Sequence, residues 1–358
     1  MKNNNLPLNF LKRESSRIPL LFIFLIVICF YLANVSLTLV GEQVAVRFIR
    51  NGILVLSLVI PIAAGMGLNF GITVGAMAAQ GAYLVSLNLN LQGGIGVLVT
   101  FVISVILALI IGYILGKLMN KVKGKEMITS IVIAALANYI YQLIFMAGFG
   151  TLIPINNEKI ALSTSIGVKN MVDLKSYKEF FESFGSIKIG GISVSIFLIL
   201  VVIFTGFIVY YILNTPFGQR IKAIGISEEK AENLGISVDK TRIIVMIIST
   251  VLAAIGQFIY LQNIGSLNVY TEHLNTDVMS CAALLAGGAS IKRASVKNAL
   301  YGTVILHILF VLSPLAGQNF FDNVALGEYF RTFIMYGVIA FALVVNIKLD
   351  NKRISSNK

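Results

Sequence analysis

The residues that could do chemistry in this sequence are mainly uncharged amides within long apolar stretches. An amide side chain carries both hydrogen-bond donors and acceptors, so several amides together could line a path for a neutral polar solute such as a sugar or a nucleoside. The candidate pathway residues are Asn69, Gln80, Asn138, Gln142 and Gln257. Amides also join neighbouring helices inside a membrane, and this packing role stays open as the alternative for each of them.

Patterns that would indicate catalysis or metal binding are missing from the sequence. It contains no G-x-x-x-x-G-K-[ST] phosphate-binding loop, no H-E-x-x-H helix and no G-x-S-x-G turn. The two histidines, His273 and His307, lie far apart, and the two cysteines, Cys29 and Cys281, fall in apolar stretches. We expect His307 to be a packing residue rather than a proton relay, the cysteines to be free thiols, and the chain to bind no metal or cofactor.

A charged segment between two apolar stretches carries the most specific local pattern. Ser227 is a favourable helix N-cap residue, the acidic Glu228 suits the positive first turn of a helix, and Gly235 is a natural helix stop. The spacing predicts a two-turn helix over about 228–234, which could dock in a groove of a partner protein. Its exposed apolar tip would be Leu234 and Ile236. An ordinary solvated loop helix is the alternative.

The composition indicates what kind of protein must position these residues. Of 358 residues, 57% are hydrophobic and 12% are charged, whereas soluble domains carry about 25% charged residues. A soluble enzyme and a disordered chain are therefore excluded. The net charge is +12, but the basic residues are dispersed between apolar stretches. This dispersal is typical of the cytoplasmic loops of a membrane protein and not of a nucleic-acid-binding surface.

Long apolar stretches recur along the whole chain and predict an all-α polytopic membrane protein with about ten transmembrane helices. The expected spans are 18–40, 48–66, 69–91, 95–119, 126–148, 193–213, 242–263, 274–290, 298–315 and 328–347. Glycine and polar residues interrupt the spans near 48–91 and 274–290, which are expected to be broken or partly re-entrant. With both termini in the cytoplasm, most of the Lys and Arg residues fall on the inner side, as the positive-inside rule requires.

We expect residues 1–358 to form a single transmembrane domain. It would comprise a basic cytoplasmic segment (1–17), an external loop (149–192), a cytoplasmic loop (214–241) and a cytoplasmic tail (348–358). The first apolar stretch is too long for a signal peptide, so it is expected to remain as the first span.

The external loop contains apolar positions at helical spacing from Met171 to Phe184. This spacing predicts an amphipathic helix that either docks a partner protein or packs on the neighbouring spans.

The expected spans carry almost no charge, with Asp277 and Arg331 placed near their outer ends. Ion-coupled carriers usually place ionisable groups inside the membrane, so we expect the energy source of any transport to lie elsewhere. Glycines at four-residue spacing predict close helix packing, with a pore-lining break near 65–75 as the alternative. These glycines are Gly67, Gly71 and Gly75, and then Gly112 and Gly116.

Two segments resemble the permease subunits of type II ATP-binding-cassette importers, the group that handles simple sugars, nucleosides and branched-chain amino acids. That family shows a Gly-x-x-x-x-Ala-x-Gly segment followed by an E-A-A-x-x-x-G-I coupling loop. Here the first covers 218–225 and the second covers 229–236, with Lys230 in place of the middle alanine. A small-residue stretch over 282–291 is also similar to the family.

This resemblance implies that the chain is the transmembrane permease subunit of an importer and moves a small neutral polar solute by ATP-driven alternating access. Residues 227–236 would then be the coupling helix that contacts an ATPase. The residues assigned to this contact are Ser227, Glu228, Glu229, Lys230, Ala231, Leu234, Gly235 and Ile236. ATP and Mg²⁺ would bind on the partner ATPase, which agrees with the missing phosphate-binding loop.

The implied partners are ABC ATPase subunits, a second permease subunit (a copy or a paralogue), an extracellular solute-binding protein and the lipid bilayer, with no nucleic acid. The implied location is the bacterial cytoplasmic (inner) membrane. A simple sugar or nucleoside is preferred as the solute. The alternatives are a branched-chain amino acid permease of the same importer class, a stand-alone secondary carrier or channel, and a membrane scaffold without a transport role.

Overall fold

The structure is a computed structural model that describes residues 17–182, 184–189, 192–334, 336–337, 340–341 and 344. Its first elements are α2 (Arg17–Ala33), α3 (Leu37–Ser57), α4 (Val59–Ala63), α5 (Ile72–Asn88), α6 (Gly93–Lys121), α7 (Glu126–Leu143) and the π-helical turn η2 (Ile144–Gly148). Next come β1 (Met171–Asp173), α8 (Lys175–Glu182), β2 (Ser186–Ile189), β3 (Ile192–Ser195), α9 (Ile196–Asn214), α10 (Pro216–Ile226) and α11 (Glu228–Asn233). The last are α12 (Val238–Ile264), β4 (Ser266–Asn268), α13 (Thr276–Ala286) and α14 (Val296–Phe321).

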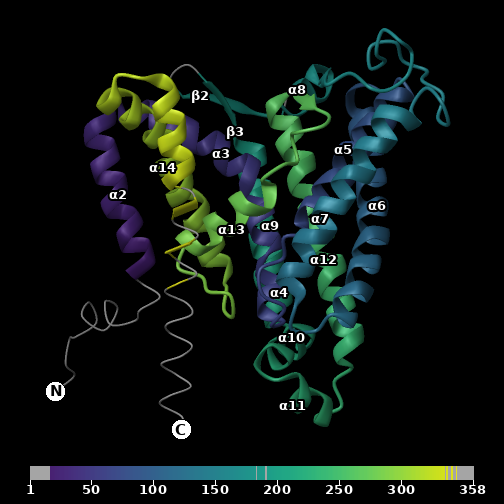
Figure 1. The fold of residues 1–358 in the computed structure, drawn as a ribbon, viewed down its shortest axis with the longest axis vertical. Helices are drawn as coiled ribbons and strands as arrows, with labels where there is room; N and C mark the ends of the chain where they lie inside the picture. Colours follow the sequence, from purple (N-terminus) through teal and green to yellow (C-terminus); the bar gives the residue numbers. More distant parts are fainter. Residues whose placement is uncertain are drawn as a thin grey trace.

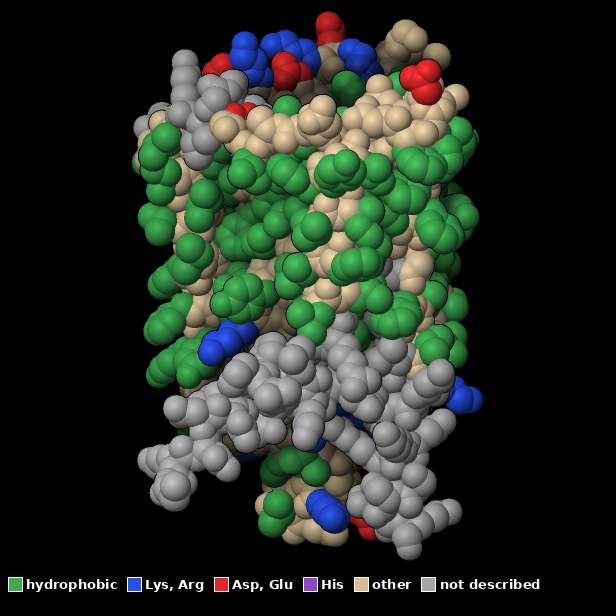
Figure 2. Space-filling view, turned by 90° about the vertical axis from the view of Figure 1, so that its left-hand side faces the viewer, with side chains coloured by type: hydrophobic (Ala, Val, Ile, Leu, Met, Phe, Trp, Pro, Cys, Tyr) green, Lys and Arg blue, Asp and Glu red, His purple; other side chains and the backbone are tan. Residues whose placement is uncertain are grey.

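Six helical segments of the described residues are long and apolar enough to cross a membrane. They are Leu37–Ala63, Gly93–Lys121, Glu126–Gly148, Ile196–Asn214, Val238–Ile264 and Val296–Phe321. One face of the molecule carries a broad band of hydrophobic side chains, with Lys, Arg, Asp and Glu gathered at its upper edge (Figure 2). The prediction of an all-α polytopic membrane protein is therefore confirmed.

The other four expected spans correspond to shorter or partly described helices. They are α2, α5, α13 and a helical stretch over 324–334. The 11 residues of α13 extend about 16 Å at the α-helical rise, roughly half of the ~30 Å hydrocarbon core. The expected span 328–347 is described only in part, and the tail 348–358 and the basic segment 1–17, except for Arg17, lie outside the described residues.

The helices form two groups that meet along α3 and α12. The first group contains α2, α13 and α14, and the second contains α5, α6 and α7 (Figure 1). Helix α14 packs against α2, α3 and α13, whereas α12 packs against α6, α3 and α5. Helices α10 and α11 lie at one end of the molecule, and α8 with β2 and β3 lies at the opposite end (Figure 1).

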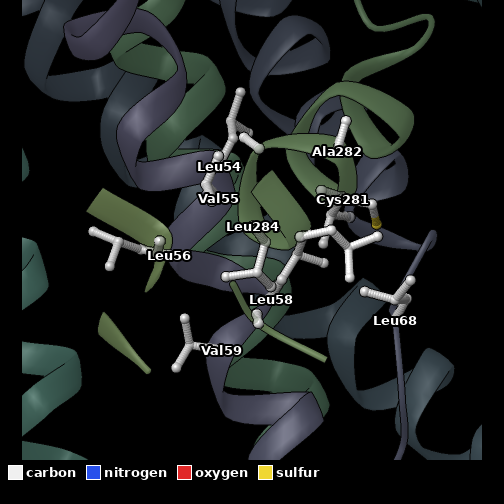
Figure 3. Close-up of a cluster of buried hydrophobic side chains, with 14 of the residues drawn as sticks. Leu54, Val55, Leu56, Leu58, Val59, Leu68, Cys281, Ala282 and Leu284 are labelled. Carbon is white, nitrogen blue, oxygen red and sulfur yellow. The ribbon is translucent and has the colours of Figure 1, made fainter. Parts of the chain in front are cut away.

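A continuous apolar core joins the second half of α3 to α13. Leu54, Val55, Leu56 and Leu58 are fully or almost fully buried there, and they lie around the buried α13 face that contains Cys281 and its neighbours (Figure 3). Both cysteines are free and buried, as predicted.

Glycines allow several of these helices to touch through their backbones. A Cβ on Gly112 or Gly116 would lie 2.7 or 2.8 Å from a Cα atom of α12, and a Cβ on Gly75 would lie 2.6 Å from the Thr250 carbonyl oxygen. These contacts confirm the predicted close packing. Gly67 differs, because a Cβ there would meet nothing within 4 Å and its φ of +73° instead serves the turn between α4 and α5.

The boundary between the first two spans differs from the prediction of 18–40 followed by 48–66. Helix α2 ends at Ala33, Asn34 has a φ of +47°, and Ser36 then caps α3 by accepting a hydrogen bond from the Leu39 amide. The chain thus turns seven residues earlier than hydropathy indicates, because a polar turn fits inside the apolar run. As a result, α3 contains Glu42, Arg47 and Arg50, and the expectation of almost uncharged spans is wrong for this helix.

The 149–192 loop contains short strands as well as a helix. Strand β1 pairs antiparallel with β4 in the register Met171 to Asn268, so the predicted helix over 171–184 is wrong for its first residues. Helix α8 covers only Lys175–Glu182. Leu174 and Tyr177 are buried, and the Tyr177 hydroxyl donates a hydrogen bond to the Leu91 carbonyl oxygen at 2.7 Å. The apolar side of this segment therefore packs on the body of the protein.

Candidate functional site

The charged segment after α9 forms two short helices whose ends are defined by side-chain caps. The Thr215 hydroxyl accepts a hydrogen bond from the Gly218 amide at 3.3 Å at the start of α10, next to Pro216 in the first turn. The Ser227 hydroxyl accepts one from the Lys230 amide at 3.3 Å at the start of α11. Gly235 follows α11 with a φ of +78°, which an L side chain rarely adopts. The predicted capped helix is confirmed.

One face of α11 is buried and the rest is open. Ala231 forms a small core with Ile224 and Val238, and Ile236 packs against it. Leu234 is 76% exposed and Ile226, at the end of α10, is 84% exposed. The predicted apolar tip is therefore corrected: Ile236 belongs to the packed face, and Ile226 takes its place beside Leu234. Of the other predicted contact residues, Glu229, Lys230 and Gly235 are exposed, whereas Ser227 and Glu228 are half-buried.

An ion-pair cluster attaches α11 to the ends of three long helices. The Arg242 guanidinium, only 1% exposed, forms salt bridges with Glu126 at the start of α7 and with Glu228 at the start of α11. Its Nε donates a hydrogen bond to the Asn120 side-chain oxygen of α6 at 3.0 Å. We name these four residues and Lys123 the base cluster.

Lys123 forms the outer part of the base cluster. Its ammonium lies 2.7 Å from an Asp239 carboxylate oxygen and 3.3 Å from one of Glu228. The hydrogen bond from the ammonium to Asp239, helped by Glu228, raises the pKa of Lys123 because the charged form is favoured. Sequence reasoning identified only Glu228 in this cluster. The other members lie more than 100 residues away or in a span, and a single sequence does not show which charges meet.

Three of the five candidate pathway amides come together around a histidine that the sequence did not single out. His273 is fully buried; its Nδ1 lies 2.9 Å from Gln80 Oε1 and its Nε2 lies 2.7 Å from Asn138 Oδ1. Gln142 Nε2 donates to the same Asn138 oxygen at 3.2 Å. The Tyr141 ring stands edge-on to the imidazole at a centroid distance of 5.1 Å. We name these five residues the polar cluster.

The polar cluster retains unused hydrogen-bonding groups. Among the described residues, the buried Gln80 Nε2 and Tyr141 hydroxyl have no hydrogen-bond partner. A neutral imidazole donates from one nitrogen and accepts at the other, so a rotated Gln80 amide would satisfy Nδ1 while Nε2 donates to Asn138. The cluster thus combines amides, an imidazole and aromatic rings, which are groups suited to a hydroxylated neutral solute.

The other two pathway candidates make different contacts. Asn69 Nδ2 donates to the Ser249 hydroxyl at 3.2 Å, and its Oδ1 accepts from the Gly71 amide at 2.9 Å, so it fixes the turn between α4 and α5. Gln257 is buried in α12, and its Nε2 has no partner among the residues that the structure describes.

The two arginines of α3 each lie over an aromatic ring. Arg47 lies 4.9 Å from the centroid of Phe310, and Arg331 lies 4.4 Å from the same ring. Arg50 donates to the Asn263 side-chain oxygen at 2.6 Å. His307 is buried beside Phe310, as expected for a packing residue, but its Nδ1 has no hydrogen-bond partner among the described residues.

A family model matches most of the chain, whereas individual known proteins match about half of it or less. A family model described as "Branched-chain amino acid transport system / permease component" matches residues 41–343. A probable ABC transporter permease protein, YphD of Escherichia coli (strain K12), is 30% identical over 159 residues, which are 43% of this chain and 44% of that protein.

Two further relatives come from Haemophilus influenzae (strain ATCC 51907 / DSM 11121 / KW20 / Rd). The ribose import permease protein RbsC is 25% identical over 49% of this chain and 52% of its own length. The xylose transport system permease protein XylH is 30% identical over 39% of this chain and 35% of its own length. The matches therefore span about half of these relatives or less. No solved structure matches the chain.

Proposed function

The chain belongs to the family of branched-chain amino acid transport system permease components, and from this premise we propose that it is the membrane-spanning subunit of an ATP-driven importer. Members of this family are transport components rather than enzymes. The observation that carries the proposal is α11, a capped helix at one end of the molecule with the exposed apolar Leu234 beside it. Because its sequence resembles a coupling loop, we propose that its partner is the ATPase.

In this proposal α11 transmits ATP-driven movement of the ATPase to the spanning helices. The exposed Glu229, Lys230 and Leu234 contact the ATPase, and the packed Ala231 and Ile236 fix the helix to the protein. ATP and Mg²⁺ bind on the ATPase chains. A second permease subunit completes the pathway, and a solute-binding protein delivers the solute at the α8 end. The molecule lies in the bacterial inner membrane with about ten spans and both termini in the cytoplasm.

The solute is a small neutral polar molecule, with a simple sugar preferred. Two observations support this choice. The polar cluster offers neutral hydrogen-bonding groups beside an aromatic ring, and the relatives named for a solute are permeases for ribose, xylose and fructose. A nucleoside has the same hydroxylated character. The family description names branched-chain amino acids, which keeps such an amino acid as the alternative solute.

Gentle purification of the chain from its native membranes, followed by mass spectrometry, tests the proposed function. We expect an ATPase and a solute-binding protein to accompany it. Glu229→Ala combined with Gly235→Pro should remove the ATPase, because proline cannot adopt the positive φ at residue 235. Glu179→Ala on α8, at the opposite end, is the control and should retain it. A chain that is recovered alone and transports in liposomes without an ATPase would be a secondary carrier, and the proposal would be wrong.

A further inference from the structure

Arg242 is placed to connect the coupling helix with α7, which carries three members of the polar cluster. Resting on the proposed function, we propose that Arg242, with Glu126 and Glu228, is the joint through which α11 moves α7 and α12. Arg242 is a positioning residue in this role: it touches neither solute nor ATP, and it acts by holding three elements at one point.

The chemistry of the joint favours rigid transmission. A guanidinium presents five donors in a planar fork, and here it bonds to Glu126 of α7, Glu228 of α11 and Asn120 of α6. Arg242 is 1% and the Glu126 side chain 11% exposed, so water screens this ion pair weakly, whereas the Glu228 side chain is 34% exposed. Losing one partner would leave a buried charge incompletely compensated. The pairs should therefore move together rather than open separately.

Of the helices held at this joint, α7 leads to the polar cluster and α12 carries the separate pathway candidate Gln257. Glu126 begins α7, which carries Asn138 about 18 Å further along the helix axis at 1.5 Å per residue. Arg242 lies in α12, which carries Gln257 about 22 Å further along by the same rise. A tilt of either helix at its base would displace these amides.

Further contacts, made by Lys123 and Asn120, strengthen the attachment of α11 to the joint. Lys123 bonds to both Glu228 and Asp239, at 3.3 and 2.7 Å, and Asn120 Nδ2 donates to the Asp239 carbonyl oxygen at 2.8 Å. Glu228 thus joins α11 to two cations at once. Glu232, on the same helix, is exposed and makes no salt bridge among the described residues. Comparing substitutions of Glu228 and Glu232 therefore distinguishes an effect of the joint from an effect of the negative charge of α11.

The test measures solute transported per ATP hydrolysed by the complete complex in proteoliposomes. Glu228→Gln should lower this ratio by at least about fivefold, the lower end of typical coupling effects, while the ATPase remains bound and active. Glu126→Gln, which lies outside α11, should lower the ratio in the same way. Glu228→Asp keeps the charge and should restore much of the coupling, and Glu232→Gln is the matched control with a normal ratio.

The outcomes distinguish this inference from the proposed function. If the unsubstituted complex shows no ATP-dependent uptake, the proposed function itself is wrong. If that complex is coupled but Glu228→Gln and Glu126→Gln transport as much solute per ATP as Glu232→Gln, the ion pairs do not transmit movement and the inference is wrong. Loss of the ATPase from the Glu126→Gln complex would also overturn the inference, because the cluster would then serve assembly rather than transmission.

Discussion

At the scale of single residues, His273 changes the interpretation of the pathway amides. The sequence indicated Gln80, Asn138 and Gln142 by their type and setting, and gave His273 no role. The structure brings His273 from the segment before α13 to bond two of these amides, on α5 and α7. Hydrophobic patterning reveals which amides lie in apolar helices, but it does not reveal which of them meet, because that depends on how α5, α7 and the 265–275 segment pack.

His273→Phe should impair uptake more than His273→Gln does. Phenylalanine fills the space but removes the partner that the buried Gln80 and the half-buried Asn138 share, whereas glutamine can still donate and accept. An unsatisfied buried group costs about 1–3 kcal/mol, so a small loss of thermal stability is also expected for the phenylalanine variant. Initial uptake rates in proteoliposomes, together with unfolding temperatures in detergent, provide the measurement. Equal uptake by the two variants would contradict the proposal that the polar cluster lines the solute pathway.

At the scale of elements, the sequence predicted what local chemistry determines. The N-cap Ser227 and the glycine at 235 define α11 within one residue of the expected range, and six expected spans correspond to long apolar helices. The break between α2 and α3 was missed because Asn34 and Ser36 interrupt the apolar run only briefly. The pairing of β1 with β4 was missed because its partners lie nearly 100 residues apart, and no local pattern encodes that distance.

Gly302→Ala should destabilise the protein, because α13 and α14 touch through their backbones. A Cβ at residue 302 would lie 1.9 Å from the Ala283 carbonyl oxygen and 2.8 Å from the Gly287 amide nitrogen. Overpacking of this kind costs about 1–3 kcal/mol.

Gly41→Ala is the matched control, because a Cβ there would meet nothing within 4 Å and alanine favours a helix interior by about 1 kcal/mol over glycine. Thermal unfolding of both variants in detergent checks the difference. A Gly302→Ala protein as stable as Gly41→Ala would mean that the two helices can separate without cost.

At the scale of the whole molecule, the two ends are built from different secondary-structure elements. One end has α10, α11 and the base cluster, and the other has α8 and two short antiparallel strand pairs (Figure 1). The positive-inside rule predicts that the α11 end faces the cytoplasm. The same orientation follows from the proposed docking of an ATPase, since ATP is available on that side.

Cysteine labelling should establish this orientation. Met171→Cys and Leu234→Cys lie at opposite ends, and both positions are more than 60% exposed. A membrane-impermeant maleimide should label Met171→Cys on intact protoplasts and Leu234→Cys only after the membrane is opened. The unsubstituted chain is the control, because Cys29 and Cys281 are buried. Labelling of Leu234→Cys from outside would reverse the orientation.

The shortness of α13 limits which side of the protein can face lipid. The 265–275 segment before it reaches into the helix bundle, because His273 contacts the middle of α5 and of α7. Much of this segment is non-helical, and hydrocarbon offers no partners for peptide groups outside a regular helix. Phospholipid chains therefore cannot solvate the exposed part of this segment, which includes Thr271 and Leu274, and we expect water or protein to contact it. Acyl chains are accordingly expected on the apolar outer helices rather than on this part of the α13 flank.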